Sequence, residues 1–234
     1  MTERLPEKIE RTEDTTREVG KLVLDVIQTR RSIREGFIDK PVPNDVISEI
    51  IQSGLTAPSS KNAQPWRVHV VHRGEMLDDI ADYVQSAKDA NRYAPIDPAT
   101  GEMRQWPSTV AKSAQTLREV GVGLFVENTA PFSGGKSYFS KHLRQNEGVL
   151  LDGYALEMMS LGAMVQNMWL SAHAQGLCGV FMGDVMVAED DISKRLEFDG
   201  DLTGVLALGY ADQNTFDKQL GAAKVVFHTL GEEA

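Results

Sequence analysis

The sequence predicts a layered domain that combines helices with a β-sheet, of the α/β or α+β class. Segments with apolar residues at helical spacing alternate along the chain with short segments that have the pattern of strands. In addition, the 234 residues are 41% hydrophobic and 25% charged, which is the balance of an ordinary globular protein. These observations define the class, but the order of elements alone indicates no function.

The first part of the chain contains two predicted helices, a strand and a third helix. Apolar residues at helical spacing predict a helix that begins near Leu22 and ends at the basic residues that start with Arg30. Asn44 is the expected N-cap of a second helix with an apolar stripe. Residues 67–71 alternate between apolar and polar in the manner of a strand, and Gly74 opens the third helix.

The second part has a long segment without a stable period and one long helix. Residues 91–118 are predicted to form a lid or a loop insertion. Residues 131–136 are also loop-like, and the long helix is expected over residues 146–174. Three further apolar segments predict strands, over residues 120–126, 177–182 and 203–209.

Charge and cysteine content exclude several classes of partner and location. The chain has 24 basic and 34 acidic residues, a net charge of −10, which argues against a nucleic-acid partner. Residues 1–20 form a charged N-terminal arm without the apolar stretch of a signal peptide, and a single cysteine, Cys178, fits a reducing compartment. The uncharged residues 158–183 are interpreted as a core helix and its exit. We therefore expect a cytoplasmic protein without a membrane partner.

Three arginines within five residues stand out in this acidic chain. Arg30, Arg31 and Arg34 flank Ser32, and guanidinium groups pair well with phosphate oxygens, while the hydroxyl and nearby backbone N–H groups can add donors. This pattern suits a ligand that carries a phosphate. The same residues could instead end a helix and pair with the acidic residues that follow, and taken alone the cluster favours that second interpretation.

A second polar segment lies at residues 57–66. It contains two hydroxyls, two carboxamides and an indole, and the carboxamides of Asn62 and Gln64 could read the edge of a planar heterocycle such as a flavin. Alternatively, its Pro, Ser and Asn residues form an ordinary turn, with Trp66 as a core anchor. In isolation the segment supports both interpretations equally.

The order and spacing of these motifs resemble the N-terminal signature of the nitroreductase-like flavoenzymes. The signature comprises residues 30–34, Pro41-Val42-Pro43, an apolar helix, and residues 57–66 followed by a Val-rich strand. A second and less specific block comprises Gln166-Asn167, the residues around His173, Met182-Gly183 and residues 206–210. Residues 91–145 carry no such resemblance.

The resemblance implies a fold and an activity. The fold would be α+β with three layers, a mixed, mainly antiparallel sheet flanked by helices, in an intertwined homodimer, with residues 21–234 as one FMN-binding domain. The activity would be that of an FMN-dependent NAD(P)H oxidoreductase that reduces nitroaromatic, quinone or similar planar acceptors by a ping-pong hydride mechanism. Two alternatives stay open: a specialised flavin-dependent dehydrogenase or dehalogenase, and a flavin-binding protein without turnover.

The resemblance also implies which residues contact FMN. One subunit would bind the phosphate and the N1/C2 carbonyl side of the ring with Arg30, Arg31, Ser32 and Arg34. The other subunit would contribute Pro58, Ser59, Ser60 and Asn62, joined by Gln64, while Met182 and Gly183 would approach the flavin N5 and Lys224 would be a further phosphate candidate.

No side chain is expected to act as a nucleophile, since the cofactor carries the chemistry. Arg34 is expected to give electrostatic support to the reduced flavin, whose N1/C2 carbonyl region gains negative charge. No His, Cys or carboxylate spacing in the sequence indicates a metal site.

Overall fold

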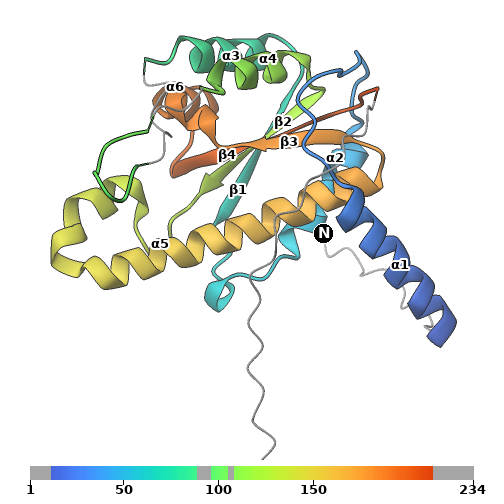
Figure 1. The fold of residues 1–234 in the computed structure, drawn as a ribbon, viewed down its shortest axis with the longest axis horizontal. Helices are drawn as coiled ribbons and strands as arrows, with labels where there is room; N and C mark the ends of the chain where they lie inside the picture. Colours follow the sequence, from blue (N-terminus) through green and yellow to red (C-terminus); the bar gives the residue numbers. More distant parts are fainter. Residues whose placement is uncertain (1–11, 89–95, 105–107, 213–234) are drawn as a thin grey trace, which may run out of the picture.

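A four-stranded sheet lies between two helical layers (Figure 1). The computed structural model describes residues 12–88, 96–104 and 108–212, with the side chains of residues 143–147 left aside. The strands follow the order β1-β2-β4-β3 with antiparallel neighbours, and their bounds are β1 Trp66–His72, β2 Val122–Asn128, β3 Cys178–Met182 and β4 Asp201–Gly209. An isolated parallel bridge joins Ser32 to Gly179 at the β3 edge. The prediction of a three-layer α+β fold with a mixed, mainly antiparallel sheet is confirmed.

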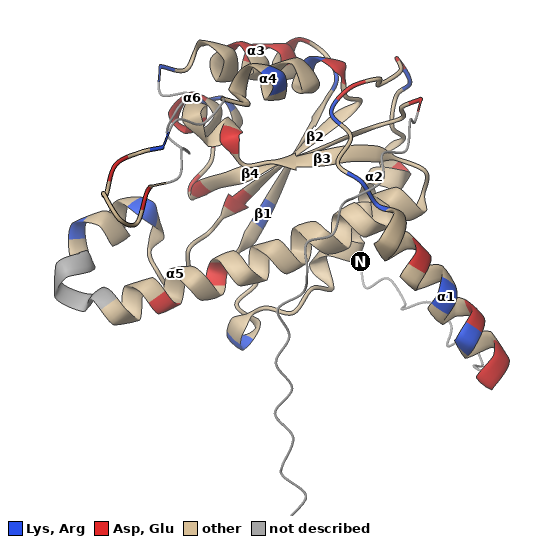
Figure 2. Cartoon of the chain, in the orientation of Figure 1, with Lys and Arg blue, Asp and Glu red and all other residues tan. Residues whose placement is uncertain are grey.

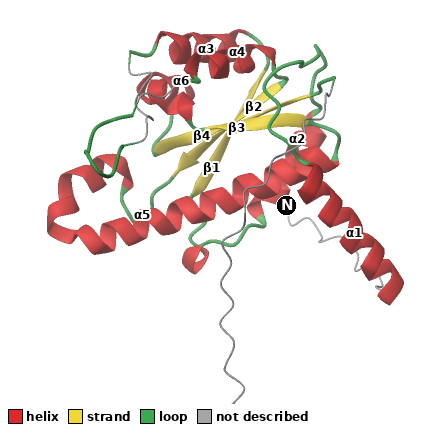
Figure 3. Ribbon diagram, viewed as in Figure 1, coloured by secondary structure: helices red, strands yellow, loops and turns green. Residues whose placement is uncertain are grey.

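The described helices divide between the two faces of the sheet, as Figure 3 shows in red and yellow. Their bounds are α1 Glu13–Thr29, α2 Asn44–Leu55, η1 Ser60–Asn62, α3 Glu75–Ser86, α4 Val110–Glu119, α5 Gly135–Ala174, η2 Asp184–Ala188 and α6 Glu189–Leu196. One apolar cluster joins α3, α4, η2 and α6 to the sheet. A second joins α2 and α5 to its other face. The predicted strands and the first three helices are all present, with shifted ends.

Helix α1 extends into the predicted N-terminal arm. It begins at Glu13, because the hydroxyl of Thr12 accepts the N–H of Thr15 at 3.2 Å and caps the first turn. In Figure 1 the helix projects away from the body of the molecule. Five of its apolar side chains are between 47% and 68% exposed, and Val26 is half-buried; the five are Val19, Leu22, Val23, Leu24 and Ile27. An amphipathic helix with no buried residue therefore leaves a whole apolar stripe uncovered within one chain.

The N-cap of α2 differs from the prediction. Asn44 is the first helical residue, and Pro43 is the cap, whose carbonyl accepts the N–H of Ile47 at 3.1 Å. The fixed φ of proline holds the entry to the helix, so no side-chain cap is needed to begin it.

Helix α4 corrects the prediction that residues 91–118 form a loop throughout. Residues 110–118 of that segment are helical, and a lid role for the remainder stays a prediction. The buried face of α4 includes Ser113, Ala114 and Thr116 beside Val110 and Leu117. Because small and hydroxylated side chains occupy three of its five buried positions, the apolar period was too weak to indicate a helix.

Helix α5 begins at Gly135, earlier than the predicted residue 146. The loop expected over residues 131–136 therefore ends at Gly134. Asp201 accepts the N–H of Lys136 at 2.7 Å and fixes the first turn from a distant strand.

A part of α5, Gly148–Ala174, is long and apolar enough to cross a membrane by length and composition, and 39% of the relevant window is buried inside the fold. Core helices of proteins outside membranes pass the same test. The buried residues Leu161, Met164 and Met168 belong to the cluster that packs on α2 and the sheet, which agrees with the predicted core helix. Val149 and Met159 on the same helix stay 75% and 72% exposed.

Candidate functional site

The arginine segment is held against the β3 edge of the sheet. Arg30 is the C-cap of α1, and the chain then runs beside β3, where Ser32 bridges to Gly179 and the N–H of Ile33 donates to the Gly179 carbonyl at 2.9 Å. In Figure 2 the blue of basic residues marks the segment after α1, whereas red marks the exposed side of α3. The backbone therefore presents the predicted anion-binding residues at one edge of an acidic molecule.

Arg30 has a buried donor without a partner. Its Nη1 makes no hydrogen bond within the described part of the chain, and its Cζ lies 4.0 Å from the centroid of the Trp169 ring. Burial, and then repulsion from Arg31, lowers the pKa of Arg30 below its ordinary value. An orphaned buried guanidinium N–H is rare and suits an anionic ligand.

The other predicted residues of this segment differ in their surroundings. Arg31 folds back on the end of α1, where its Nη1 donates to the carbonyls of Gln28 at 2.5 Å and Arg30 at 3.0 Å. Ser32 and Arg34 are exposed, and the carbonyl of Arg34 accepts the hydroxyl of Thr116 at 2.8 Å. Arg31 therefore binds the end of a helix, as the second interpretation of the cluster expected, whereas Ser32 and Arg34 face solvent.

The acidic residues that follow the cluster have other partners. Glu35 pairs with Lys112 at 3.2 Å, and Asp39 pairs with Arg73 at 2.9 Å. These two carboxylates, which the sequence suggested as partners of the arginine cluster, therefore pair with other cations. They do not compensate the positive charge of the arginines.

An apolar cavity of about 300 Å³ lies between α5 and strands β3 and β4. It is lined by Met158, Leu161, Gly162, Val165, Gln166 and Trp169 of α5, with Phe181 of β3 and Thr203 of β4. Its volume lies at the lower end of the range for small-molecule sites. Trp169 connects it to Arg30, so an apolar wall and the unpartnered guanidinium N–H adjoin.

Met182 is the last residue of the strand that carries Phe181, and Gly183 follows it. Met182 is buried and Gly183 half-buried. The next residue, Asp184, accepts the hydroxyls of Thr109 at 2.6 Å and Ser113 at 2.8 Å, which ties the end of β3 to the start of α4. The structure thus brings two of the predicted groups, residues 30–34 and 182–183, to the same strand.

The segment with Pro58, Ser59, Ser60, Asn62 and Gln64 lies elsewhere in the chain. It precedes β1, the strand at the opposite edge of the sheet from β3. Within the segment, Ser59 Oγ accepts the N–H of Gln64 at 3.0 Å, and the N–H of Ser60 donates to Ser160 Oγ on α5 at 3.3 Å. Its predicted contact with flavin, through a partner subunit, stays a prediction, and Lys224 lies outside the described residues.

The backbone of this turn is strained. Lys61, Asn62 and Gln64 have φ values of 51°, 55° and 47°, in the left-handed region that non-glycine residues seldom adopt. For Lys61 and Gln64 this costs on the order of 1–2 kcal/mol each, whereas asparagine adopts this region more readily. Strain of this kind is concentrated at functional sites, which favours a ligand-binding role over an ordinary turn.

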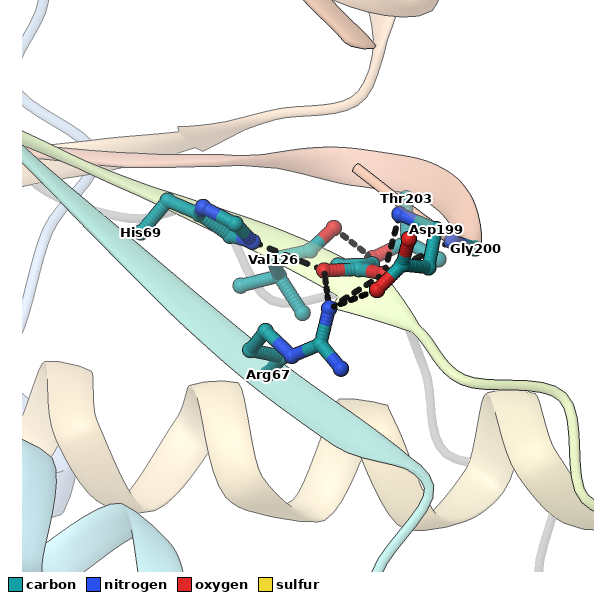
Figure 4. Close-up of polar contacts among 7 residues, drawn as sticks. Arg67, His69, Val126, Asp199, Gly200 and Thr203 are labelled. Carbon is teal, nitrogen blue, oxygen red and sulfur yellow. Dashed lines mark hydrogen bonds and ion pairs between the residues drawn. The ribbon is translucent and has the colours of Figure 1, made fainter. Parts of the chain in front are cut away.

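Glu127 forms a buried polar cluster that the sequence did not reveal (Figure 4). This fully buried carboxylate lies 2.7 Å from His69 Nε2 and 3.3 Å from Arg67 Nη1. It also accepts the N–H groups of Asp199 at 3.1 Å and Gly200 at 2.7 Å. Its oxygens are occupied by the loop between α6 and β4, so we assign it a structural role. The only sequence signal was an acidic residue inside an apolar strand.

Glu157 is a second buried carboxylate, on α5. It accepts Asn128 Nδ2 at 3.0 Å, the N–H groups of Phe132 at 2.7 Å and Ser133 at 2.9 Å, and the Ser133 hydroxyl at 2.6 Å. These bonds hold the loop that leads into α5. Across the described ranges, no group of three or more His, Cys, Asp or Glu side chains is placed to hold a metal.

Known proteins are similar to this chain in sequence and in fold. The model of the nitroreductase family matches residues 27–210. The chain is 26% identical over 214 residues to a chloronitrobenzene nitroreductase of Comamonas testosteroni, which covers 86% of this chain and 92% of that protein. A shorter match, 41% identical over 71 residues, joins 30% of this chain to 29% of a nitrobenzene nitroreductase of Ectopseudomonas oleovorans.

A solved structure described as a nitroreductase with bound FMN, from Desulfitobacterium hafniense DCB-2, has the same fold. Its TM-score is 0.63 at 19% sequence identity, and the match covers 89% of this chain and 98% of that chain.

His173 provides a prediction about pH. Burial, followed by repulsion from Arg30, lowers the pKa of His173 below its ordinary value of about 6.5, and its Nε2 lies 2.9 Å from the Thr29 hydroxyl. Below about pH 6.5 the unfolded chain takes up a proton that the folded chain resists, so unfolding becomes easier as pH falls. We expect the difference in unfolding free energy between the wild type and His173→Gln to shrink from pH 7.5 to pH 5.5.

Urea unfolding at a series of pH values would measure this difference. Thr29→Val is the matched control, because it removes the hydrogen bond but no titratable group. A difference that grows toward low pH would contradict the lowered pKa of His173.

Proposed function

The chain belongs to the nitroreductase family, and from this premise we propose that it is an FMN-dependent NAD(P)H oxidoreductase that reduces nitroaromatic, quinone or similar planar acceptors in the cytoplasm. The observation that carries the proposal is the orphaned Nη1 of Arg30 beside an apolar cavity at the β3 edge. A phosphate-bearing planar cofactor needs both an anion site and an apolar wall.

The residues present fit FMN. Arg30 offers an unused donor for the phosphate, and Ser32 and Arg34 are exposed on the same segment. Phe181 and Trp169 give the cavity aromatic walls for part of the ring system, and Gly183 has no side chain to crowd the end of β3. Arg31 would contribute to phosphate binding only if its guanidinium released the carbonyls of Gln28 and Arg30.

When bound, FMN supplies the hydride chemistry, with NAD(P)H as donor and the planar acceptor as oxidant in a ping-pong sequence. The chain supplies binding and electrostatics. Arg30 and Ser32 would hold the phosphate, and the charge of Arg34 would support negative charge on the N1/C2 carbonyl side. No side chain is required as a nucleophile.

We also propose that the functional unit is a homodimer. The apolar stripe of α1 and the exposed Val149 and Met159 of α5 are surfaces that a second copy would cover. Within one chain, residues 58–64 lie near the sheet edge opposite to the arginine segment. In a dimer, these residues of the second copy would meet the arginine segment of the first copy. This arrangement would make each flavin site depend on both subunits.

An absorbance spectrum tests the cofactor and the reaction together. We expect the purified or FMN-reconstituted protein to be yellow, and its flavin absorbance near 450 nm, roughly the wavelength at which oxidised flavins absorb, to bleach anaerobically on addition of NADH or NADPH. A nitroaromatic or quinone should then restore the absorbance.

Three other outcomes distinguish the alternatives. Protein that takes up no FMN contradicts the proposal altogether. Bound flavin that neither nicotinamide reduces favours a specialised dehydrogenase or dehalogenase, and flavin that is reduced but never reoxidised by an acceptor favours a binding protein without turnover.

Substitution of the arginines tests the assignment of the anion site. We expect Arg30→Ala and Arg34→Ala each to weaken FMN binding by about 1.5–3 kcal/mol, because each removes a charged hydrogen-bond donor. Titration of the apoprotein with FMN, followed by flavin fluorescence, measures the change. Arg73→Ala, which removes a surface cation paired with Asp39, is the control. Wild-type affinity in both arginine variants would overturn the assignment.

A third measurement tests the dimer. We expect Leu22→Asp combined with Ile27→Asp, which places charges on the apolar stripe of α1, to convert the protein to a monomer of about half the wild-type mass in light scattering. The variant should lose FMN affinity as well, since each site would lack its second subunit. A wild-type protein that is monomeric at micromolar concentration with FMN bound would contradict the proposal.

A further inference from the structure

We propose that Trp169 is a positioning residue for the anion site: its indole holds the guanidinium of Arg30 in place while the same ring forms a wall of the apolar cavity. The inference rests on the proposed function, in which Arg30 binds the FMN phosphate. It adds a residue of α5 that touches the arginine and the cavity at once.

The contact is direct and joins two distant parts of the chain. Arg30 caps the end of α1, and its Cζ lies 4.0 Å from the centroid of the Trp169 ring, within the range of a cation–π interaction. Trp169 lies late in α5, on the part of the helix that lines the cavity together with Val165 and Gln166. One side chain therefore connects the two halves of the proposed FMN site.

The chemistry of an indole suits this task better than that of a carboxylate. A carboxylate partner would occupy the N–H donors of Arg30 and cancel its charge, so a phosphate would have to compete for the arginine. The face of an indole attracts the cation without accepting any of its hydrogen bonds. This agrees with the observation that Nη1 is buried and still has no partner among the described residues.

The charges around Arg30 point in the same direction. Arg31 repels it, and the neighbouring His173 has a lowered pKa, so neither residue compensates the positive charge. Asp25 lies close enough to His173 to act on its titration, although no ion pair joins Asp25 to Arg30 among the described contacts. Without the indole, the guanidinium would gain hydration by turning toward solvent.

The chain contains a natural control for this interaction. Lys40 lies 3.8 Å from the centroid of the Tyr210 ring, in a second cation–π pair that does not line the cavity. Replacing Tyr210 therefore removes an interaction of the same kind and leaves the proposed site untouched.

The experiment compares two ligands that differ only in the phosphate. Dissociation constants of FMN and riboflavin are measured for the wild type, Trp169→Leu, Trp169→Phe and Tyr210→Leu, with circular dichroism to check the fold of each. We expect Trp169→Leu to weaken FMN binding about tenfold more than riboflavin binding, since it releases the phosphate-binding arginine. Trp169→Phe should restore a part of the difference, and Tyr210→Leu should change neither ligand.

A double-mutant cycle shows whether Trp169 acts through Arg30. In the Arg30→Ala background, Trp169→Leu should weaken FMN and riboflavin equally, because no guanidinium remains to be positioned. This expectation holds whatever affinity both ligands lose because the cavity lacks the indole ring.

The outcomes separate this inference from the function on which it rests. Equal losses for FMN and riboflavin in Trp169→Leu, in the presence of Arg30, would reduce Trp169 to a packing residue and overturn the inference alone. Unchanged affinities would also overturn it. Failure of the wild type to bind FMN would overturn the proposed function, and the positioning role with it.

Discussion

The pairing of one irregular segment with the edge of a sheet organises the whole site. The N–H of Ile33 donates to the Gly179 carbonyl, and this bond places residues 30–34 along β3. The same strand carries Phe181 and ends at Met182, directly before Gly183, so this backbone contact brings the arginines near the cavity and the strand end. Without it, the cluster would be the basic end of an exposed helix.

The electrostatics of the molecule make this segment unusual. The protein carries a net charge of −10, and many acidic side chains could neutralise three arginines. Glu35 and Asp39, the nearest in sequence, pair with Lys112 and Arg73 instead. Arg30 is held by an aromatic ring rather than by a carboxylate. The fold thus preserves positive charge at one place, which is the condition for binding an anion there.

Two buried carboxylates give the scaffold its rigidity. Glu127 fixes the loop before β4 to β2, and Glu157 fixes the loop before α5. Both accept several backbone and side-chain donors, so neither has an unsatisfied oxygen to offer a ligand. The elements that frame the cavity, α5 and β4, are therefore each tied to a neighbouring loop by a buried carboxylate.

By itself the sequence determined the elements with strong local patterns, namely the four strands, α2, α3 and most of α5, together with the arginine cluster and its family resemblance. Periodicity encodes which face of an element is buried, and it is weak where small or polar residues pack inward, as in α4. Only the tertiary structure decided that Ile33 pairs with Gly179 and that Trp169 meets Arg30. These outcomes depend on contacts between residues far apart in the chain, and spacing along a sequence carries no information on which distant partner a side chain will meet.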